Sequence, residues 1–277
     1  MTELESLLVR YPRWVALTGA GISAGSGIPT YRNDRGEWQR SDPIQHQDFL
    51  TQEASRRRYW ARSMAGWTYV AASKPNLAHI ALARLEATGH ITLLATQNVD
   101  RLHQAAGHQR VVDLHGRLDR VCCLNCNATL SRAALQQELA ELNAGWHQTI
   151  IDIRPDGDAE VDDAIVDSMQ VPPCKACGGT LMPDVVFFGG TVPKPRVEAI
   201  TTAINEADAL LVAGSSLTVF SGFRFVRMAH KAGKPVIIVN RGHTRGDDLA
   251  TLKIEADAGP VLDQLANSAG SASASVG

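Results

Sequence analysis

Short apolar runs bounded by turn residues recur along the chain and are separated by stretches of helical periodicity. The runs cover residues 14–17, 91–95, 185–188, 209–213 and 236–239. Because they are short and do not alternate with polar residues, they predict strands that are buried on both faces of a parallel sheet. Such an alternation of strands and helices is typical of an α/β protein with helices on both faces of the sheet.

Helical periodicity fills most of the intervals between these runs. Asn76 precedes apolar residues at helical spacing and is a favourable helix cap, so we expect a helix to begin there. Further helices are predicted over residues 196–207, 223–232 and 259–265. Residues 40–73 fall outside the alternation and predict a small helical insertion.

The composition favours a globular chain that binds neither nucleic acid nor membrane. Hydrophobic residues make up 44% and charged residues 20% of the 277 residues, far from the profile of a disordered chain. The net charge of −2 gives no electrostatic support for non-specific binding to nucleic acid. No apolar run reaches the roughly 18 residues of a membrane span, and the first residues are acidic where targeting leaders are basic. We therefore expect a soluble cytoplasmic protein without direct nucleic-acid or membrane partners.

Four of the five cysteines form two pairs, each with two intervening residues. The pairs are Cys123 with Cys126 and Cys174 with Cys177, and the remaining Cys122 is expected to be a half-buried structural thiol. In a chain of this length and class, such pairs indicate a metal rather than disulfides. Four thiolates suit tetrahedral Zn²⁺ and leave no position for water, which predicts one structural zinc ion per chain rather than a catalytic one.

A glycine-rich turn follows the first predicted strand. Gly19, Gly21 and the small Ala24 have the spacing of the dinucleotide fingerprint, in which the backbone approaches a pyrophosphate closely. The turn alone is weak evidence, because small-residue turns after buried strands are common. Two further glycines and Pro29 then break the helix that continues in dehydrogenases, and no acidic residue ends a second strand. Both departures argue against hydride transfer.

Polar residues follow three of the predicted strands at their carboxyl ends. They are residues 96–100, residues 214–216 and Asn240. Each could be a cap or a turn former, but ligands bind beyond the carboxyl ends of open parallel sheets, so together they predict one cleft. His115 lies just past another short apolar run and is the best general-base candidate of the nine histidines. Neutral imidazole near pH 7 can accept a hydroxyl proton.

These residues together resemble the sirtuins, a family of NAD-dependent protein deacylases. The matching segments, in the family's order, are residues 19–23, 27–32, 96–100, 114–116, 183–189 and 214–217, together with both cysteine pairs. Trp60, Trp67 and residues 217–225 are similar to the class II branch, which is shared by many bacteria and one mitochondrial member.

The resemblance implies a Rossmann-like parallel sheet with a smaller zinc-binding module inserted in it. The expected parts are a large NAD-binding domain of residues 1–39, 74–118 and 183–266, a helical insertion of the small domain over residues 40–73, and the zinc-binding module over residues 119–182. Residues 267–277 lack apolar bulk and predict a disordered tail.

The resemblance also implies roles for individual residues. NAD is the expected co-substrate, bound by Gly19, Ala20, Gly21, Ile22, Ser23, Arg32, Gln97, Asn98, Asp100, Gly214, Ser215, Ser216, Asn240, Arg241, Gly242 and Ala258. Acylated-lysine proteins or peptides are the expected partners, bound as an added strand by Val186, Phe187, Phe188, Gly189 and Val219. His115 and Asn98 are the expected catalytic residues.

The implied reaction cleaves NAD and frees the lysine. Nicotinamide leaves as the acyl oxygen attacks the ribose, and binding energy that orients NAD lowers the barrier to this step. His115 then removes a proton from a ribose hydroxyl group. The products are lysine, nicotinamide and O-acyl-ADP-ribose.

Other functions and the choice of acyl group stay open at this point. Transfer of ADP-ribose to protein, attributed to some class II sirtuins, would use the same NAD pocket, and a non-catalytic zinc-ribbon binding module is a more distant alternative. Tyr59 and Arg62 resemble the Tyr-x-x-Arg pair with which another sirtuin branch binds acidic acyl groups. Residues 56–62 are equally compatible with one solvated helix face.

Overall fold

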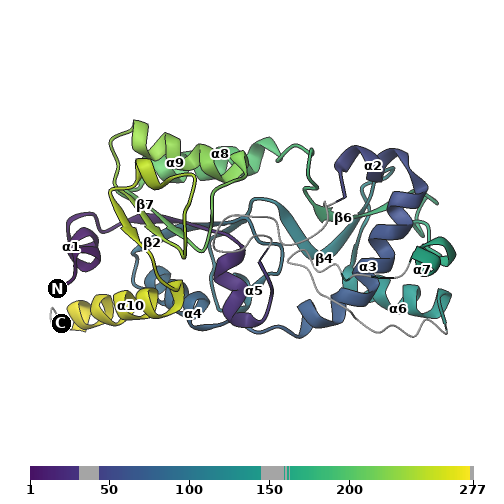
Figure 1. The fold of residues 1–277 in the computed structure, drawn as a ribbon, viewed down its shortest axis with the longest axis horizontal. Helices are drawn as coiled ribbons and strands as arrows, with labels where there is room; N and C mark the ends of the chain where they lie inside the picture. Colours follow the sequence, from purple (N-terminus) through teal and green to yellow (C-terminus); the bar gives the residue numbers. More distant parts are fainter. Residues whose placement is uncertain (31–43, 145–158, 160, 162, 275–277) are drawn as a thin grey trace.

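The computed structural model describes residues 1–30, 44–144, 159, 161 and 163–274. Two sheets lie side by side along the long axis of the molecule, a parallel one of six strands and an antiparallel one of three (Figure 1). In the part of the chain that the structure describes, no helix has the length and apolar character needed to cross a membrane.

The parallel sheet has the strand order β3-β2-β1-β7-β8-β9. Its strands are β1 (Trp14–Thr18), β2 (Ile91–Thr96), β3 (Val111–Asp113), β7 (Ala209–Ala213), β8 (Val236–Val239) and β9 (Leu252–Ile254). β1, β7 and β8 are buried along their whole length, as expected for strands without polar alternation. The order reverses between β1 and β7, and open parallel sheets bind ligands at such a switch point.

Helices cover both faces of the parallel sheet, which confirms the predicted α/β architecture (Figure 1). One face carries α1 (Glu3–Arg10), α4 (Leu77–Ala87) and α10 (Ala258–Ala274), and the other carries α8 (Lys194–Glu206) and α9 (Phe220–Lys231). The helix predicted after Asn76 is α4, and the Asn76 side chain caps it by accepting the N–H of Ala78 at 2.9 Å.

The last helix is longer than the sequence predicts. A disordered tail is expected from residue 267, whereas α10 continues to Ala274. Ala269 is buried in the core that α10 shares with α1 and α4. The hydroxyl group of Ser268 also donates a hydrogen bond to the carboxylate of Glu5 on α1 at 2.7 Å. These tertiary contacts stabilise a segment whose own composition has little apolar bulk.

The antiparallel sheet has the order β5-β4-β6 and belongs to a second core. Its strands are β4 (Gly116–Cys123), β5 (Thr129–Ser131) and β6 (Leu181–Val185), and its helices are α2 (His46–Thr51), α3 (Glu53–Ala72), α6 (Arg132–Leu142) and α7 (Asp163–Ser168). The short helices η1 (Ala20–Ser26), α5 (Leu102–Ala105) and η2 (Asp247–Leu249) complete the described elements. The helical insertion and the cysteine-bearing segment therefore pack against each other.

A buried arginine joins these two segments. Arg132, at the start of α6, is 1% exposed, and its guanidinium carbon lies 5.6 Å and 5.2 Å from the ring centroids of Trp60 and Trp67 on α3. Its Nη2 donates a hydrogen bond to the carbonyl of Ser63 at 3.0 Å. A buried cation needs such contacts to offset its lost hydration, so Arg132 holds α6 against α3.

The apolar run at residues 185–188 is not a strand of the parallel sheet, and the prediction is wrong on this point. Val185 ends β6, which pairs with β4 in the small sheet. The N–H of Val186 donates to the carbonyl of His115 at 2.7 Å, so the rest of the run stays beside the end of β3. β6 closely follows the second cysteine pair, and this position commits it to the cysteine-bearing sheet.

Candidate active site

A cleft of about 740 Å³ lies at the carboxyl ends of β1, β2, β7 and β8. The residues that follow these strands form one part of its wall, and residues 185–192 and 217–221 form another. The predicted site residues that line it are Gly19, Ala20, Gly21, Ser23, Gln97, Asn98, Asp100, His115, Val186, Phe187, Phe188, Gly189, Gly214, Ser215, Ser216, Val219, Asn240, Arg241 and Ala258. The polar clusters predicted at separate strand ends thus meet in one cleft.

Some residues predicted for the site are not among the described residues that line the cleft. Ile22 is buried, Gly242 accepts a hydrogen bond from Lys253, and neither is part of the lining. Arg32 lies outside the described residues. Of the Tyr-x-x-Arg pair, Tyr59 lines the cleft and Arg62 does not.

Two glycine turns pack against each other at the switch point. The N–H of Gly21, after β1, donates to the carbonyl of Gly214, after β7, at 2.8 Å. A Cβ atom on Gly19 would lie 2.8 Å from the Cβ of Ser215, and one on Gly21 would lie 2.9 Å from the carbonyl oxygen of Gly214. Side chains are therefore excluded at these positions, and the two turns pack directly against each other in the cleft wall. A wall of such small residues lets a diphosphate approach the backbone closely, as in the dinucleotide fingerprint.

We expect the substitution Gly214→Ala to weaken NAD binding at least about tenfold and to destabilise the fold by more than the roughly 1–2 kcal/mol of a left-handed residue. Gly214 has φ of +61°, and its added Cβ would lie 2.3 Å from the backbone nitrogen of Ile22. Calorimetric titration with NAD and urea unfolding measure the two effects.

The matched control for this prediction is Gly233→Ala. Gly233 also has a positive φ, of +69°, but a Cβ there would meet no atom within 4 Å. This variant should carry only the backbone cost and should bind NAD normally. Equal effects of both variants on NAD affinity would contradict the assigned role of the turn.

Three polar side chains form a hydrogen-bonded group on the floor of the cleft. The hydroxyl group of Ser23 donates to Asp100 Oδ2 at 2.6 Å and accepts from Asn98 Nδ2 at 3.0 Å. Asp100 Oδ1 accepts the N–H of Leu102 at 2.9 Å. Burial raises the pKa of Asp100, and these hydrogen bonds oppose the shift. The group joins the turn after β1 to the turn after β2, so its members are held in one orientation.

His115 presents one ring nitrogen to the cleft as a hydrogen-bond acceptor. Its Nδ1 lies 3.0 Å from the carbonyl oxygen of Gln97, and a carbonyl can only accept, so Nδ1 carries the proton. Nε2 is then free to accept, and the hydroxyl group of Ser221 donates to it at 2.7 Å. Burial lowers the pKa of His115 to about 4, and the charges of Arg196 and Arg224 act in the same direction, against the hydrogen bond to Gln97. The imidazole is therefore neutral at pH 7.

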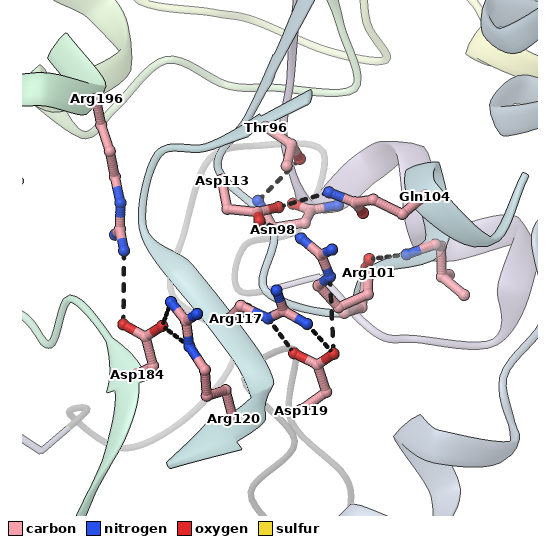
Figure 2. A network of polar contacts seen from close by, with 12 residues as sticks. Thr96, Asn98, Arg101, Gln104, Asp113, Arg117, Asp119, Arg120, Asp184 and Arg196 are labelled. Carbon is pink, nitrogen blue, oxygen red and sulfur yellow. Dashed lines mark hydrogen bonds and ion pairs between the residues drawn. The ribbon is translucent and has the colours of Figure 1, made fainter. Parts of the chain in front are cut away.

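Ion pairs of Arg101 connect the end of β3 with β4, the two elements that flank His115 in the sequence (Figure 2). Arg101 follows β2, and its guanidinium group contacts the carboxylate of Asp113 at the end of β3. Its Nε lies 3.8 Å from Asp119 Oδ2 on β4. Arg101 has a left-handed φ of 68°, which costs a non-glycine residue roughly 1–2 kcal/mol. The pairs offset this strain and connect the large sheet to the small one.

A second group of ion pairs spans the same junction (Figure 2). Asp184 on β6 accepts a hydrogen bond from Arg120 Nε on β4 at 2.7 Å. The opposite oxygen of Asp184 lies 3.5 Å from Nη2 of Arg196 on α8. Along the chain, His115 and Gly116 lie between Asp113 and Asp119 of the first group, and Arg120 of the second group follows directly. The two groups therefore restrict how far the small sheet can move relative to His115.

The four paired cysteines converge as predicted. Their Sγ atoms all lie within 4.8 Å of one another, with 3.5 Å between Cys123 and Cys177 and 3.8 Å between Cys126 and Cys174. Tetrahedral Zn²⁺ with bonds of about 2.3 Å places thiolates roughly 3.8 Å apart, so the arrangement fits zinc. Backbone N–H groups of Cys126 and Asn125 lower the pKa of Cys123 to about 6, whereas contacts with the other cysteines of the cluster raise the pKa of Cys177. The fifth cysteine, Cys122, is half-buried.

Ser221 and Arg224 line the cleft, and the sequence did not predict either of them as a site residue. The helix there was predicted to begin at residue 223, but α9 begins at Phe220. The earlier start places Ser221 and Arg224 one turn apart on the same helical face, and both line the cleft. Their i, i+3 spacing is the one signal in the sequence, and it has no meaning until the start of the helix is known.

The chain is similar to one family of proteins along most of its length. The profile of the Sir2 family matches residues 19–221. NAD-dependent protein deacetylase 2 of Bradyrhizobium diazoefficiens is 51% identical over 253 residues, which cover 91% of this chain and 93% of that protein. NAD-dependent protein deacetylase of Bordetella bronchiseptica is 47% identical over 268 residues, which cover 96% and 98%.

Solved structures extend the similarity to the arrangement of the two sheets. One, described as "Sir2-p53 peptide-NAD+", superimposes with a TM-score of 0.79 at 30% sequence identity. The match covers 98% of each chain, so it includes both the parallel sheet and the cysteine-bearing sheet.

Proposed function

The chain belongs to the Sir2 family and is an NAD-dependent protein deacetylase, and from this premise we propose that His115 is the base of its reaction. The observation that carries this assignment is the hydrogen-bond pattern of the imidazole. The carbonyl of Gln97 fixes the proton on Nδ1, and the Ser221 hydroxyl group already donates to Nε2 at 2.7 Å. An O–H donor of the substrate can therefore deliver its proton to Nε2.

The two glycine turns would hold the diphosphate of NAD. Gly19, Gly21 and Gly214 line the cleft without side chains, so a diphosphate can approach closely. Ser215 is held in place by donating its hydroxyl proton to Gln97 Oε1 at 2.6 Å. Asn240 and Ala258, at the far end of the cleft, would flank the adenosine. When bound, NAD supplies a glycosidic bond whose cleavage releases nicotinamide and provides the ribose that takes the acyl group.

The hydrogen-bonded group of Ser23, Asn98 and Asp100 would orient the nicotinamide end. Its donors and acceptors are already paired with one another, so little reorganisation is needed when a ligand binds. Asn98 would act as a positioning and catalytic side chain near the reacting carbon, with Asp100 beside the nicotinamide.

The acylated lysine would enter between two segments of the cleft wall. Residues 186–189 form one edge, and Val219, which is 41% exposed, forms the other. An extended peptide between them would add a strand, with backbone hydrogen bonds that do not depend on its sequence. This explains how one site can accept acylated lysines from different proteins.

The finer classification is also part of the proposal. Residues 217–225 with Trp60 and Trp67 favour the class II branch of the family. The ranges 1–39, 74–118 and 183–266 would make up the NAD-binding domain, except for residues 116–118 and 183–185, which belong to β4 and β6 of the small sheet. The helical insertion and the zinc-binding module would make up the small domain.

Mass analysis of the products tests the proposed reaction. Incubation with NAD and an acetyl-lysine peptide should give deacetylated peptide, nicotinamide and O-acetyl-ADP-ribose in equal amounts. The same peptide with unmodified lysine is the control and should leave NAD intact. A stable ADP-ribose adduct on the peptide or on an added protein, without O-acetyl-ADP-ribose, would show ADP-ribosyl transfer instead.

A further inference from the structure

Arg224 places a positive charge in the wall of the cleft with no acidic partner among the described residues. It lies in the second turn of α9 and lines the cleft. Its Nε is buried and has no hydrogen-bond partner. The guanidinium group lies over the ring of Phe220, with its carbon 5.5 Å from the ring centroid. Contact with an aromatic face does not replace the hydrogen bonds that a guanidinium group makes in water.

Neighbouring arginines differ from Arg224 in this respect. Arg241, which also lines the cleft, is paired with Asp257, and Arg196 is paired with Asp184. Asp100, another acidic residue of the cleft wall, accepts its hydrogen bonds from Ser23 and Leu102. Residues 185–192 and 217–221 contain no acidic residue. The charge of Arg224 is thus uncompensated within the part of the wall that the structure describes.

The position of Arg224 relates it to the substrate rather than to the diphosphate. It lies one helical turn after Ser221, whose hydroxyl group touches Nε2 of His115. Phe220, which packs over the guanidinium group, is 49% exposed at the edge of the cleft and follows Val219. The glycine turn after β1 lies in a different segment, and the turn after β7 is separated from α9 by residues 217–219, which include Val219 of the peptide edge. A ligand that reaches Arg224 therefore lies along the edge assigned to the acylated peptide.

We propose that Arg224 binds a carboxylate of the substrate, carried either at the end of the acyl chain or by an acidic side chain near the modified lysine. The inference rests on the proposed function, because it uses the peptide position given there. An arginine can bind a carboxylate through two parallel N–H···O hydrogen bonds, and partial burial strengthens such a pair. Arg62, the residue suggested by the Tyr-x-x-Arg pattern, does not line the cleft. The acidic preference is therefore assigned to α9 and not to α3.

The experiment compares kcat/KM for matched acidic and neutral substrates in wild type, Arg224→Gln and Arg224→Lys. One series varies the acyl group, with succinyl- and glutaryl-lysine against acetyl- and butyryl-lysine in one peptide. The other keeps acetyl-lysine and exchanges Glu for Gln at the flanking positions. In the series whose carboxylate Arg224 binds, Arg224→Gln should lower the ratio of kcat/KM for the acidic substrate to that for the neutral one by about 10- to 100-fold. Arg224→Lys should lower this ratio less. The series that responds identifies the source of the carboxylate.

Arg227→Gln is the matched control, because Arg227 is an exposed residue of the same helix and does not line the cleft. It should leave both ratios at their wild-type values. Calorimetry gives the corresponding ratios of peptide Kd values. Thermal unfolding checks that each variant is folded. An unchanged ratio in both series for folded Arg224→Gln would overturn the inference. Failure of wild type to consume NAD with any acylated peptide would instead refute the proposed function, while the Kd ratios still test Arg224.

Discussion

Replacing His115 with alanine should lower the rate of lysine deacetylation by about 100- to 10,000-fold, the range expected for loss of a general base. The side chain makes two hydrogen bonds, to the carbonyl of Gln97 and the hydroxyl group of Ser221, and both partners lie at the cleft. The fold should therefore survive the change. The effect follows from Nε2, which in this tautomer is the ring nitrogen that can accept a proton.

The stage at which His115 acts gives this prediction a second readout. Departure of nicotinamide requires no proton to be removed by His115, so exchange of labelled nicotinamide into NAD, in the presence of acetyl-lysine peptide, should persist in His115→Ala. Steady-state deacetylation and nicotinamide exchange are measured in parallel on the same preparation. Loss of both activities in a folded variant, or retention of both, would contradict the assigned role.

Ser221→Ala is an informative companion to this variant. The hydroxyl group of Ser221 donates to Nε2, so it competes with a substrate hydroxyl group for the same lone pair. Its removal should change deacetylation far less than removal of His115. If both variants were equally inactive, Ser221 would be part of the proton-transfer machinery, and His115 would not act alone.

Removal of zinc should unfold the small sheet and reduce activity to background. Structural zinc sites contribute about 10–16 kcal/mol of apparent binding free energy, which is comparable to the whole stability of a typical domain. Cys123 lies in β4 and Cys174 is buried in the same core, so loss of the metal removes support from the centre of this domain. β4 begins directly after His115, and β6 leads into residues 186–189. Unfolding of the small sheet should therefore also disturb these parts of the active site.

The measurement combines a chelator with a metal assay and a fold probe. Incubation with a strong zinc chelator should release one Zn²⁺ per chain, reduce β-sheet signal and abolish deacetylation, and Cys177→Ser should have the same effect. Cys122→Ser is the matched control, because Cys122 is adjacent to the cluster and is not one of its four members. Full activity in a metal-free preparation would show that the cysteines do not hold a structural metal.

Four of the six strands of the large sheet, β1, β2, β7 and β8, could be predicted closely from the sequence, whereas the short strand β9 was not predicted. The run at residues 209–213 coincides with β7 and the run at 236–239 with β8. These strands are covered by helices on both faces, so every position is apolar and the run itself marks the strand. The cap at Asn76 could also be predicted, because its side chain interacts with the backbone of the next turn and requires no tertiary partner.

The small domain and the ends of helices were less predictable. The run at residues 185–188 has the composition of a buried strand, but its surroundings are the antiparallel sheet and the cleft. The extension of α10 past residue 267 depends on packing against α1 and α4, which leaves no trace in the composition of the segment itself. Both differences arise because short segments take the structure that their neighbours stabilise.

The sequence by itself determined four strands of the large sheet and the convergence of the four paired cysteines, because these depend on local pattern or spacing. It also predicted His115 as the base of the reaction. Only the tertiary structure decided which nitrogen of His115 accepts a proton, since the carbonyl group of Gln97, which fixes the proton on Nδ1, follows a different strand. It also decided that Arg224 lines the cleft while Arg62 does not. Such contacts depend on how separate elements dock, and docking is set by the burial of surfaces that no single segment contains.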